Sequence, residues 1–108
     1  MGVTGAAGLQ PLPPGDLPEP GRLTAVTVGG QVIAVANVGG TYYAFQDACT
    51  HEECPLSDGD LDGHVVICEC HGGEFDVRTG KPLDGPVYLP LRTFAVTREH
   101  GEVRVAVP

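Results

Sequence analysis

Apolar and polar residues alternate along a block of the chain that begins at Leu23. Runs rich in β-branched and aromatic residues cover 23–28, 31–38 and 41–46, and the pairs Gly29-Gly30 and Gly39-Gly40 separate them. Tight hairpin turns require positive φ, which glycine adopts at no steric cost. The pattern therefore predicts a three-stranded antiparallel meander over these three runs.

A second β block lies near the C-terminus. The runs LRTFAVTRE and EVRVAV flank His100-Gly101, which predicts another hairpin, and HVVICEC (64–70) predicts a short strand. No window has the period of an amphipathic helix, and the central glycines disfavour one. We therefore expect an all-β fold.

The two β blocks enclose residues 47–87, where Asp-Gly pairs mark turns. We expect a small antiparallel β base formed by the two ends of the chain, with 47–87 as a loop-rich insertion that carries the chemistry. Residues 1–22 contain PLPPGDLPEPG, which cannot form a helix or a central strand. They predict an irregular, partly mobile arm with at most a short edge strand near Leu9–Leu12, so that the functional domain covers 23–108.

The composition fits one small folded domain of 108 residues. Its 16 glycines and 10 prolines indicate many loops, while 42% hydrophobic residues indicate a core. No apolar run reaches the roughly 18 residues that a membrane span needs. The sequence also starts without a charged-then-apolar leader or a twin-arginine signal, so we expect a soluble cytoplasmic protein with no membrane partner.

The net charge of −8 is concentrated in the insertion. Residues 47–87 hold ten of the 14 acids but only Arg78 and Lys81 of the six basic residues, which gives −10 + 2 = −8, and the rest of the chain sums to zero. Such a charge makes nucleic acid an unsuitable partner. It provides either a solubilising surface or a negative face that steers a positively charged partner protein.

All four cysteines and two of the four histidines lie in CTHEEC (49–54) and CECHGG (68–73). Each stretch pairs a thiolate with an imidazole in the pattern C-x-H-x16-C-x2-H. A zinc finger usually separates the two ligand types, placing two cysteines in one half and two histidines in the other. Two mixed loops can instead hold two metals, with both cysteines on one iron and both histidines on the other.

At these residues the sequence resembles the Rieske [2Fe–2S] family. The resemblance extends from SDGDLDG (57–63) through VVICECHGGEFDVRTGKPLDGP (65–86). It implies a β base with an inserted cluster-binding subdomain, and a [2Fe–2S] cluster held by Cys49 and Cys68 on one iron and by His51 and His71 on the other. Neutral histidine ligands leave less negative charge on the site than cysteines do, which raises its reduction potential. The family's histidines lie near solvent, where a redox partner docks, and loss of their outer ring protons should lower the potential as pH rises.

Positions around the ligands distinguish members of the family. In the high-potential bc-type proteins, serine and tyrosine hydroxyls donate hydrogen bonds to the cluster sulfurs, whereas this chain has Gly73 and Phe75 at the corresponding positions. The resemblance therefore implies a potential in the lower half of the family's span of roughly −150 to +300 mV. Gly85-Pro86 resembles the proline-containing loop that covers the cluster.

Cys54 and Cys70 resemble the bc-type proteins instead, where cysteines at these offsets form a disulfide that ties the two ligand loops together. The typical oxygenase ferredoxins lack this pair. By resemblance we expect a Cys54–Cys70 disulfide, worth on the order of 3 kcal/mol for a loop of about seventeen residues. Two reduced, buried thiols are the alternative that a cytosolic location favours.

Taken together, the resemblance implies an electron-transfer protein rather than a catalyst. Its partners would be a flavoprotein reductase and an oxygenase or similar terminal enzyme, which would dock near His51 and His71. One alternative is the Rieske small subunit of a multi-subunit oxidoreductase of the nitrite reductase or arsenite oxidase type. A zinc-bound structural module is another, and it would contain no iron.

Overall fold

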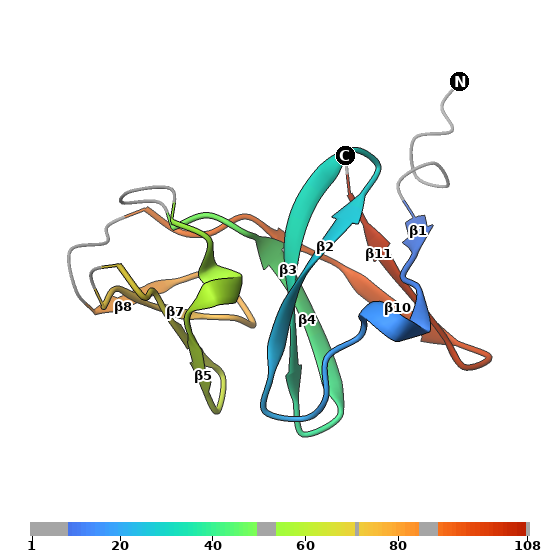
Figure 1. Cartoon of the computed structure of the whole chain (residues 1–108), viewed down its shortest axis with the longest axis horizontal. Helices are drawn as coiled ribbons and strands as arrows, with labels where there is room; N and C mark the ends of the chain where they lie inside the picture. Colours follow the sequence, from blue (N-terminus) through green and yellow to red (C-terminus); the bar gives the residue numbers. More distant parts are fainter. Residues whose placement is uncertain (1–8, 50–53, 71, 85–88, 108) are drawn as a thin grey trace.

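The structure, a computed structural model, describes residues 9–49, 54–70, 72–84 and 89–107. In these ranges the chain forms three antiparallel sheets and two short 3-10 turns, without an α-helix. Figure 1 shows a central group of strands with a smaller lobe on each side. The prediction of an all-β fold is confirmed.

The central sheet has the strand order β2-β3-β4-β9. Its first three strands are β2 (Leu23–Val28), β3 (Gln31–Val38) and β4 (Thr41–Gln46), and β9 (Thr93–Phe94) completes it. The Gly-Gly pairs between β2, β3 and β4 all have positive φ, as the two hairpin turns require. The predicted meander is confirmed with its predicted bounds.

Strand β3 is buried on both faces. Ile33 and Val35 belong to one hydrophobic cluster, and Ala34 and Ala36 belong to the other. Successive side chains of a strand point to opposite faces, so an unbroken apolar run is what a strand covered on both sides requires. The central sheet thus separates two cores, one toward each lobe.

One lobe joins the two ends of the described chain. Strand β11 (Glu102–Ala106) lies between β10 (Val96–Glu99) and β1 (Leu9–Pro11), and its partners are antiparallel on both sides. The 3-10 turn η1 (Pro14–Asp16) follows β1. His100 has φ 52° at the tip of the β10–β11 hairpin, where the sequence predicts a turn. The short edge strand predicted near Leu9 is β1.

Asn37 attaches the chain before β2 to the central sheet. Its side chain is 3% exposed and its amide donates to the Pro18 carbonyl at 2.8 Å. Its side-chain oxygen accepts from the Gly40 N–H at 2.8 Å, within the β3–β4 turn. Both bonds satisfy a polar group that would otherwise be costly to bury.

The other lobe is the insertion. It contains a four-stranded sheet of β5 (Asp60–Asp62), β6 (Val65–Ile67), β7 (Glu74–Asp76) and β8 (Pro82–Asp84), preceded by the 3-10 turn η2 (Leu56–Asp58). Its strands are only three residues long, and turns and loops occupy much of the rest, so the lobe is loop-rich as predicted. In the part of the chain that the structure covers, no helix is long and apolar enough to span a membrane.

Candidate metal centre

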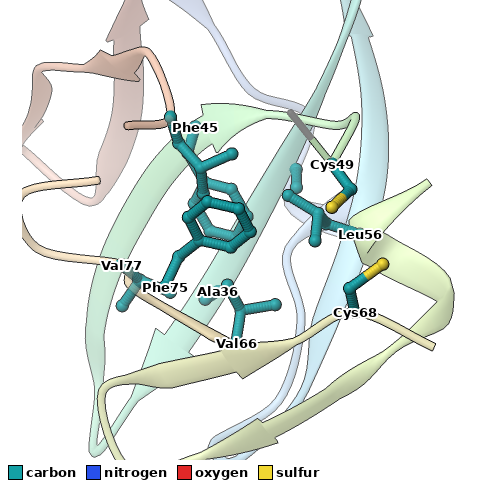
Figure 2. Close-up of a cluster of buried hydrophobic side chains, with 10 residues drawn as sticks. Ala36, Phe45, Cys49, Leu56, Val66, Cys68, Phe75 and Val77 are labelled. Atoms are coloured by element: carbon teal, nitrogen blue, oxygen red, sulfur yellow. The ribbon is translucent and has the colours of Figure 1, made fainter. Parts of the chain in front are cut away.

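Cys49 and Cys68 come together from two different loops of the insertion. Cys49 follows β4 and Cys68 follows β6, and the two side chains are 2% and 1% exposed. Both belong to the core between the central sheet and the insertion, with Leu56 beside them (Figure 2). Their sulfur atoms lie at the same end of this core and neither cysteine is in a disulfide. The structure thus places the two predicted thiolate ligands in one buried region.

Backbone hydrogen bonds fold each cysteine loop back on itself. The Cys49 N–H donates to the Cys54 carbonyl at 2.8 Å. In the second loop the Cys68 N–H donates to the Gly73 carbonyl at 2.7 Å, and the Gly72 N–H donates to the Cys68 carbonyl at 2.9 Å. Gly72 has φ +74°, a conformation that this tight turn requires and that other residues rarely adopt. Each loop therefore has backbone hydrogen bonds of its own.

A disulfide between Cys54 and Cys70 joins the two loops, as the resemblance implies. The Cα atoms of the pair are 6.5 Å apart, within the usual range for a disulfide. Cys54 is half-buried and Cys70 is exposed. Their sulfur atoms and the Cys68 sulfur all lie within 4.8 Å of one another. The bridge therefore lies close to one of the predicted ligands.

The first cysteine loop is also closed at its neck by a carboxylate. Both oxygens of Asp47 accept hydrogen bonds from Ser57, one from its N–H and one from its hydroxyl, each at 2.7 Å. Asp47 precedes Cys49 by two residues, and Ser57 follows Cys54 by three. Sequence reasoning counted Asp47 only as a charge. Nothing local distinguishes it, because its partner lies ten residues away.

Gln46 connects the same loop to the segment that leaves the insertion. Its side-chain oxygen accepts from the Arg92 N–H at 2.7 Å, and its backbone N–H donates to the Arg92 carbonyl at 2.9 Å. Its amide also donates to the Ala48 carbonyl at 3.0 Å. These bonds fix the end of β4 to Arg92, which directly precedes β9 and lies 46 residues further along the chain.

Gly73 and Phe75, which lack the bc-type hydroxyls, lie in and just after the second cysteine loop. Gly73 is buried and its carbonyl accepts the Cys68 N–H. Phe75 is fully buried and packs in the same core as Cys49 and Cys68, next to Phe45 (Figure 2). Neither residue supplies a side-chain hydroxyl, so these two positions leave the cysteine region apolar.

Three predicted site residues, His51, His71 and Pro86, lie outside the described residues. The two remaining histidines have other settings. His100 is exposed at its hairpin tip, and His64 packs edge-on against Tyr43 with their ring centroids 5.9 Å apart. The His64 carbonyl accepts from the Val77 N–H at 2.9 Å. His100 is therefore a turn residue, whereas His64 lies at the margin of the core that contains Cys49 and Cys68, because Tyr43 packs against that core and Val77 belongs to it.

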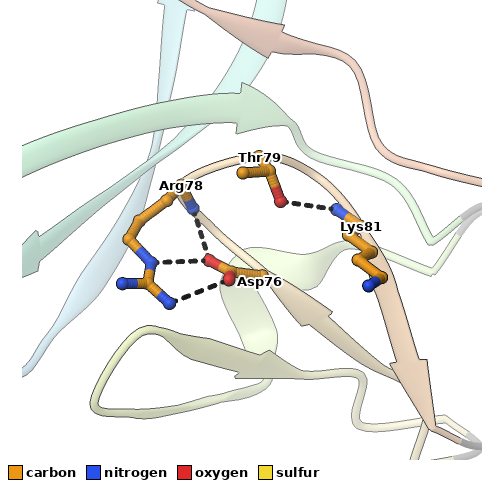
Figure 3. Close-up of polar contacts among 4 residues, drawn as sticks. All are labelled: Asp76, Arg78, Thr79 and Lys81. Carbon is orange, nitrogen blue, oxygen red and sulfur yellow. Dashed lines mark hydrogen bonds and ion pairs between the residues drawn. The ribbon is translucent and has the colours of Figure 1, made fainter.

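The acids of the insertion divide into structural and exposed ones. Asp76 accepts three hydrogen bonds from Arg78, from its backbone N–H and from its guanidinium, at 2.9 to 3.1 Å (Figure 3). The guanidinium hydrogen bonds in particular hold the pKa of Asp76 below its ordinary 3.8. Asp47 accepts the two hydrogen bonds from Ser57 that close the first cysteine loop. The acids left exposed on the described surface are Asp58, Asp60, Asp62 and Glu69.

Cys49 and Cys68 fit the pair of thiolates that hold one iron of a Rieske cluster. Two buried cysteines from separate loops converge on one region, and they stay unbridged although a disulfide forms 4.8 Å or less from Cys68. Soft thiolates in such a dry setting suit iron or zinc. The spacing of one imidazole beside each cysteine favours the two-iron arrangement over a single closed zinc site.

Comparison with known proteins agrees with this fit. The Rieske [2Fe-2S] domain model matches residues 11–95. The chain is 46% identical to Ferredoxin CarAc of Metapseudomonas resinovorans, over 82% of this chain and 83% of the relative. It is 45% identical to the ferredoxin component of biphenyl 2,3-dioxygenase from Rhodococcus jostii (strain RHA1), over 84% of each.

Solved structures are similar as well. The ferredoxin of carbazole 1,9a-dioxygenase from Nocardioides aromaticivorans IC177 has a TM-score of 0.82 at 34% identity, over 90% of this chain and 94% of that one. A ferredoxin chain solved in complex with the oxygenase of carbazole 1,9a-dioxygenase has a TM-score of 0.78 at 46% identity, over 82% of this chain and 92% of that one. With its fold, its buried cysteine pair and these matches, the chain belongs to the Rieske [2Fe–2S] family.

Proposed function

We propose that this protein is a one-electron carrier that takes electrons from a flavoprotein reductase and passes them to an oxygenase or a similar terminal enzyme. Cys49 and Cys68 are the proposed ligands of one iron, and His51 and His71 those of the other. When bound, the [2Fe–2S] cluster supplies the one-electron redox couple. The proposed domain organisation is an arm at 1–22 and a Rieske domain at 23–108, with the cluster-binding subdomain at about 47–87.

The observation that carries this proposal is the buried pair Cys49 and Cys68 in a chain that aligns over most of its length with ferredoxin components. Burial keeps water from the thiolates, and the loop hydrogen bonds and the disulfide limit how far the ligands can move. Small movement suits electron transfer, because a site that changes little between its two states loses little energy to reorganisation. The Ser57 hydroxyl that donates to the Asp47 carboxylate closes the neck of the first cysteine loop, and we assign no bond-making step to it.

The partners are proposed to dock near His51 and His71. One solved relative, 46% identical, supports an oxygenase as one partner, since it is a complex of oxygenase and ferredoxin in carbazole 1,9a-dioxygenase. The exposed acids of the insertion give this lobe a negative surface, which favours fast, weak docking to a basic partner face. The proposed location is the cytoplasm, where ferredoxin components and their reductases can meet.

A redox titration followed by EPR tests the proposal. We expect a spectrum of low average g value, as mixed histidine and cysteine ligation produces, and a potential in the lower half of the family's span of roughly −150 to +300 mV. Cys49→Ser should abolish the signal, whereas His100→Ala should leave both signal and potential unchanged. A protein that contains zinc and no iron after anaerobic purification would instead establish the structural zinc module.

The second candidate is the small subunit of a multi-subunit oxidoreductase, which the Cys54–Cys70 bridge favours because bc-type proteins share it. Gel filtration of the protein from its native lysate separates the two functions. A carrier elutes near its mass of 11.2 kDa, whereas a subunit co-elutes with a large, stable complex. The ferredoxin relatives, each matched over more than four-fifths of its length, favour the carrier.

A further inference from the structure

Three sulfur atoms converge beside the proposed cluster ligands. The Sγ atoms of Cys54, Cys68 and Cys70 all lie within 4.8 Å of one another, and two of them are joined as the disulfide. We propose that reduction of this disulfide opens a three-thiol site for a soft metal ion such as Zn²⁺. Because Cys68 belongs to both sites, a metal ion bound there competes with the cluster for this ligand.

The geometry needs little rearrangement. Zinc–sulfur bonds of about 2.3 Å at tetrahedral angles place ligand sulfurs about 3.8 Å apart. The three sulfurs already lie within 4.8 Å of one another, so side-chain rotation after the bridge opens suffices to reach that spacing. Thiolates also select thiophilic ions such as Zn²⁺ over magnesium or calcium. The proposed site therefore selects thiophilic metal ions.

The bridge is accessible to a reductant from one side. Cys70 is exposed and Cys54 is half-buried, so a dithiol reductant approaches the bridge from the Cys70 side. Its first thiolate forms a new S–S bond to Cys70, the Cys54–Cys70 bond breaks, and Cys54 leaves as a thiolate that takes a proton from water. The second thiolate then displaces Cys70 and closes the reductant's own disulfide. Two electrons pass to the protein, and metal binding releases the protons that remain on the three thiols.

The surroundings favour a cation. Glu69 lies between Cys68 and Cys70 in the chain and is exposed, and Asp58 and Asp60 add further negative charge to the same lobe. Such a surface raises the local concentration of divalent cations. This inference goes beyond electron transfer, because it concerns metal exchange at Cys68, and it rests on the proposed cluster ligation by that residue. The concentrations of thiol reductant and of zinc around the protein then determine whether it keeps its cluster.

The first experiment uses the full-length Cys49→Ser variant, which lacks a proposed cluster ligand but keeps the three sulfurs. The bridge is reduced with a water-soluble phosphine, which becomes phosphine oxide and leaves no competing thiol. Zn²⁺ is then titrated against a chromophoric chelator, and Co²⁺ is added separately to detect thiolate-to-metal absorption. We expect one tight equivalent, and binding weaker by at least roughly 100-fold when Cys70→Ser is added, because losing a direct ligand costs no less than losing a residue that only supports a ligand.

Two results would overturn the site. One is equal zinc affinity with and without the Cys70→Ser change. The other is equal affinity before and after reduction of the bridge. Either would mean that the three sulfurs do not act together on one ion.

The second experiment uses the holoprotein, so that it does not depend on how the variant folds. Bleaching of the cluster is followed with phosphine alone, Zn²⁺ alone and both together. We expect the combination to bleach the cluster faster than phosphine alone, whereas in Cys70→Ser holoprotein Zn²⁺ should not change the rate. Bleaching that Zn²⁺ accelerates equally in both proteins would contradict the competition for Cys68.

Discussion

The carboxylate of Asp47 accepts two hydrogen bonds from a single residue, Ser57, through its N–H and its hydroxyl. Both bonds are 2.7 Å long and close the neck of the loop that begins at Cys49. Charge-assisted hydrogen bonds are stronger than neutral ones, and this pair holds both ends of the loop at a fixed separation. The neck therefore contributes to placing a proposed cluster ligand.

The variant Ser57→Ala removes one of these bonds and should weaken the neck. We expect a loss of about 2 kcal/mol of stability, since hydrogen bonds to charged groups contribute about 1.5–3 kcal/mol. The thermal midpoint should fall and the cluster should bleach faster on heating. Ser57→Thr keeps the hydroxyl and serves as the matched control. Equal losses in the alanine and threonine variants would show that the hydroxyl bond does not hold the loop.

The pair Gly73 and Phe75 should set a low reduction potential, because neither supplies a hydroxyl. Gly73→Ser and Phe75→Tyr should each raise the potential by stabilising the more negative reduced site. A hydrogen bond of about 1 kcal/mol corresponds to about 40 mV for one electron. Redox titration of each purified holoprotein measures the shift.

A matched control comes from the second core. Phe94 is buried on the other side of the central sheet, in the cluster that contains Val35 rather than the cysteines. Phe94→Tyr should therefore leave the potential unchanged. If the double variant Gly73→Ser/Phe75→Tyr has the same potential as the parent, the two missing hydroxyls do not explain the low potential of the parent.

Local sequence patterns predicted the meander well, because strand alternation and Gly-Gly turns are properties of neighbouring residues. They did not predict β8 or the β4–β9 pairing, since three-residue and two-residue strands have too few positions for a period to appear. The buried pair Cys49 and Cys68 was found because its spacing is distinctive. The Asp47 neck and the Gln46–Arg92 link were missed because their partners lie 10 and 46 residues away, where composition carries no signal.

The Cys54–Cys70 bridge predicts the alkylation pattern of the denatured protein. Cys49 and Cys68 should react without reductant, and all four cysteines should react with it. Mass spectrometry of protein denatured and alkylated under anaerobic conditions counts the labels. Four labels without reductant would show that the Cys54–Cys70 disulfide is absent from the protein. The double variant Cys54→Ser/Cys70→Ser should lose about 3 kcal/mol of stability by the chain-entropy argument.

The Asp76–Arg78 ion pair predicts a dependence of stability on pH. Arg78 lowers the pKa of Asp76 below 3.8 in the folded chain, so the pair stabilises the fold above the unfolded pKa. That contribution is lost as pH falls below 3.8 through the folded pKa. Asp76→Asn should therefore be less stable than the parent at neutral pH, and the difference should shrink only in acid.

Urea unfolding at intervals from neutral pH to about pH 3 checks this, since denaturant midpoints report changes in stability directly. Asp62→Asn is the control, because Asp62 is exposed on β5. Its difference from the parent should be small at every pH. A difference between the Asp76 variant and the parent that stays constant down to the lowest pH would exclude the carboxylate's charge as the cause.

Gly80 joins the insertion to the chain that returns to the central sheet. Its N–H donates to the Asp76 carbonyl at 2.7 Å and its carbonyl accepts from the Leu91 N–H at 2.8 Å. It is buried with φ +81°, and a Cβ at this position would overlap the Leu91 carbonyl oxygen. Gly80→Ala therefore requires the backbone of the insertion and of the returning segment to move apart.

Gly63→Ala separates this overlap from ordinary backbone strain. Gly63 has φ +61° but open space where its Cβ would lie, so the change should cost only about 1 kcal/mol of left-handed strain. Gly80→Ala should cost clearly more and should speed cluster loss, because Leu91 packs in the core that holds Cys49 and Cys68. Thermal midpoints and bleaching rates of the two variants measure the difference. If the two are equally stable, the close approach of Gly80 to Leu91 does not hold the insertion against the central sheet.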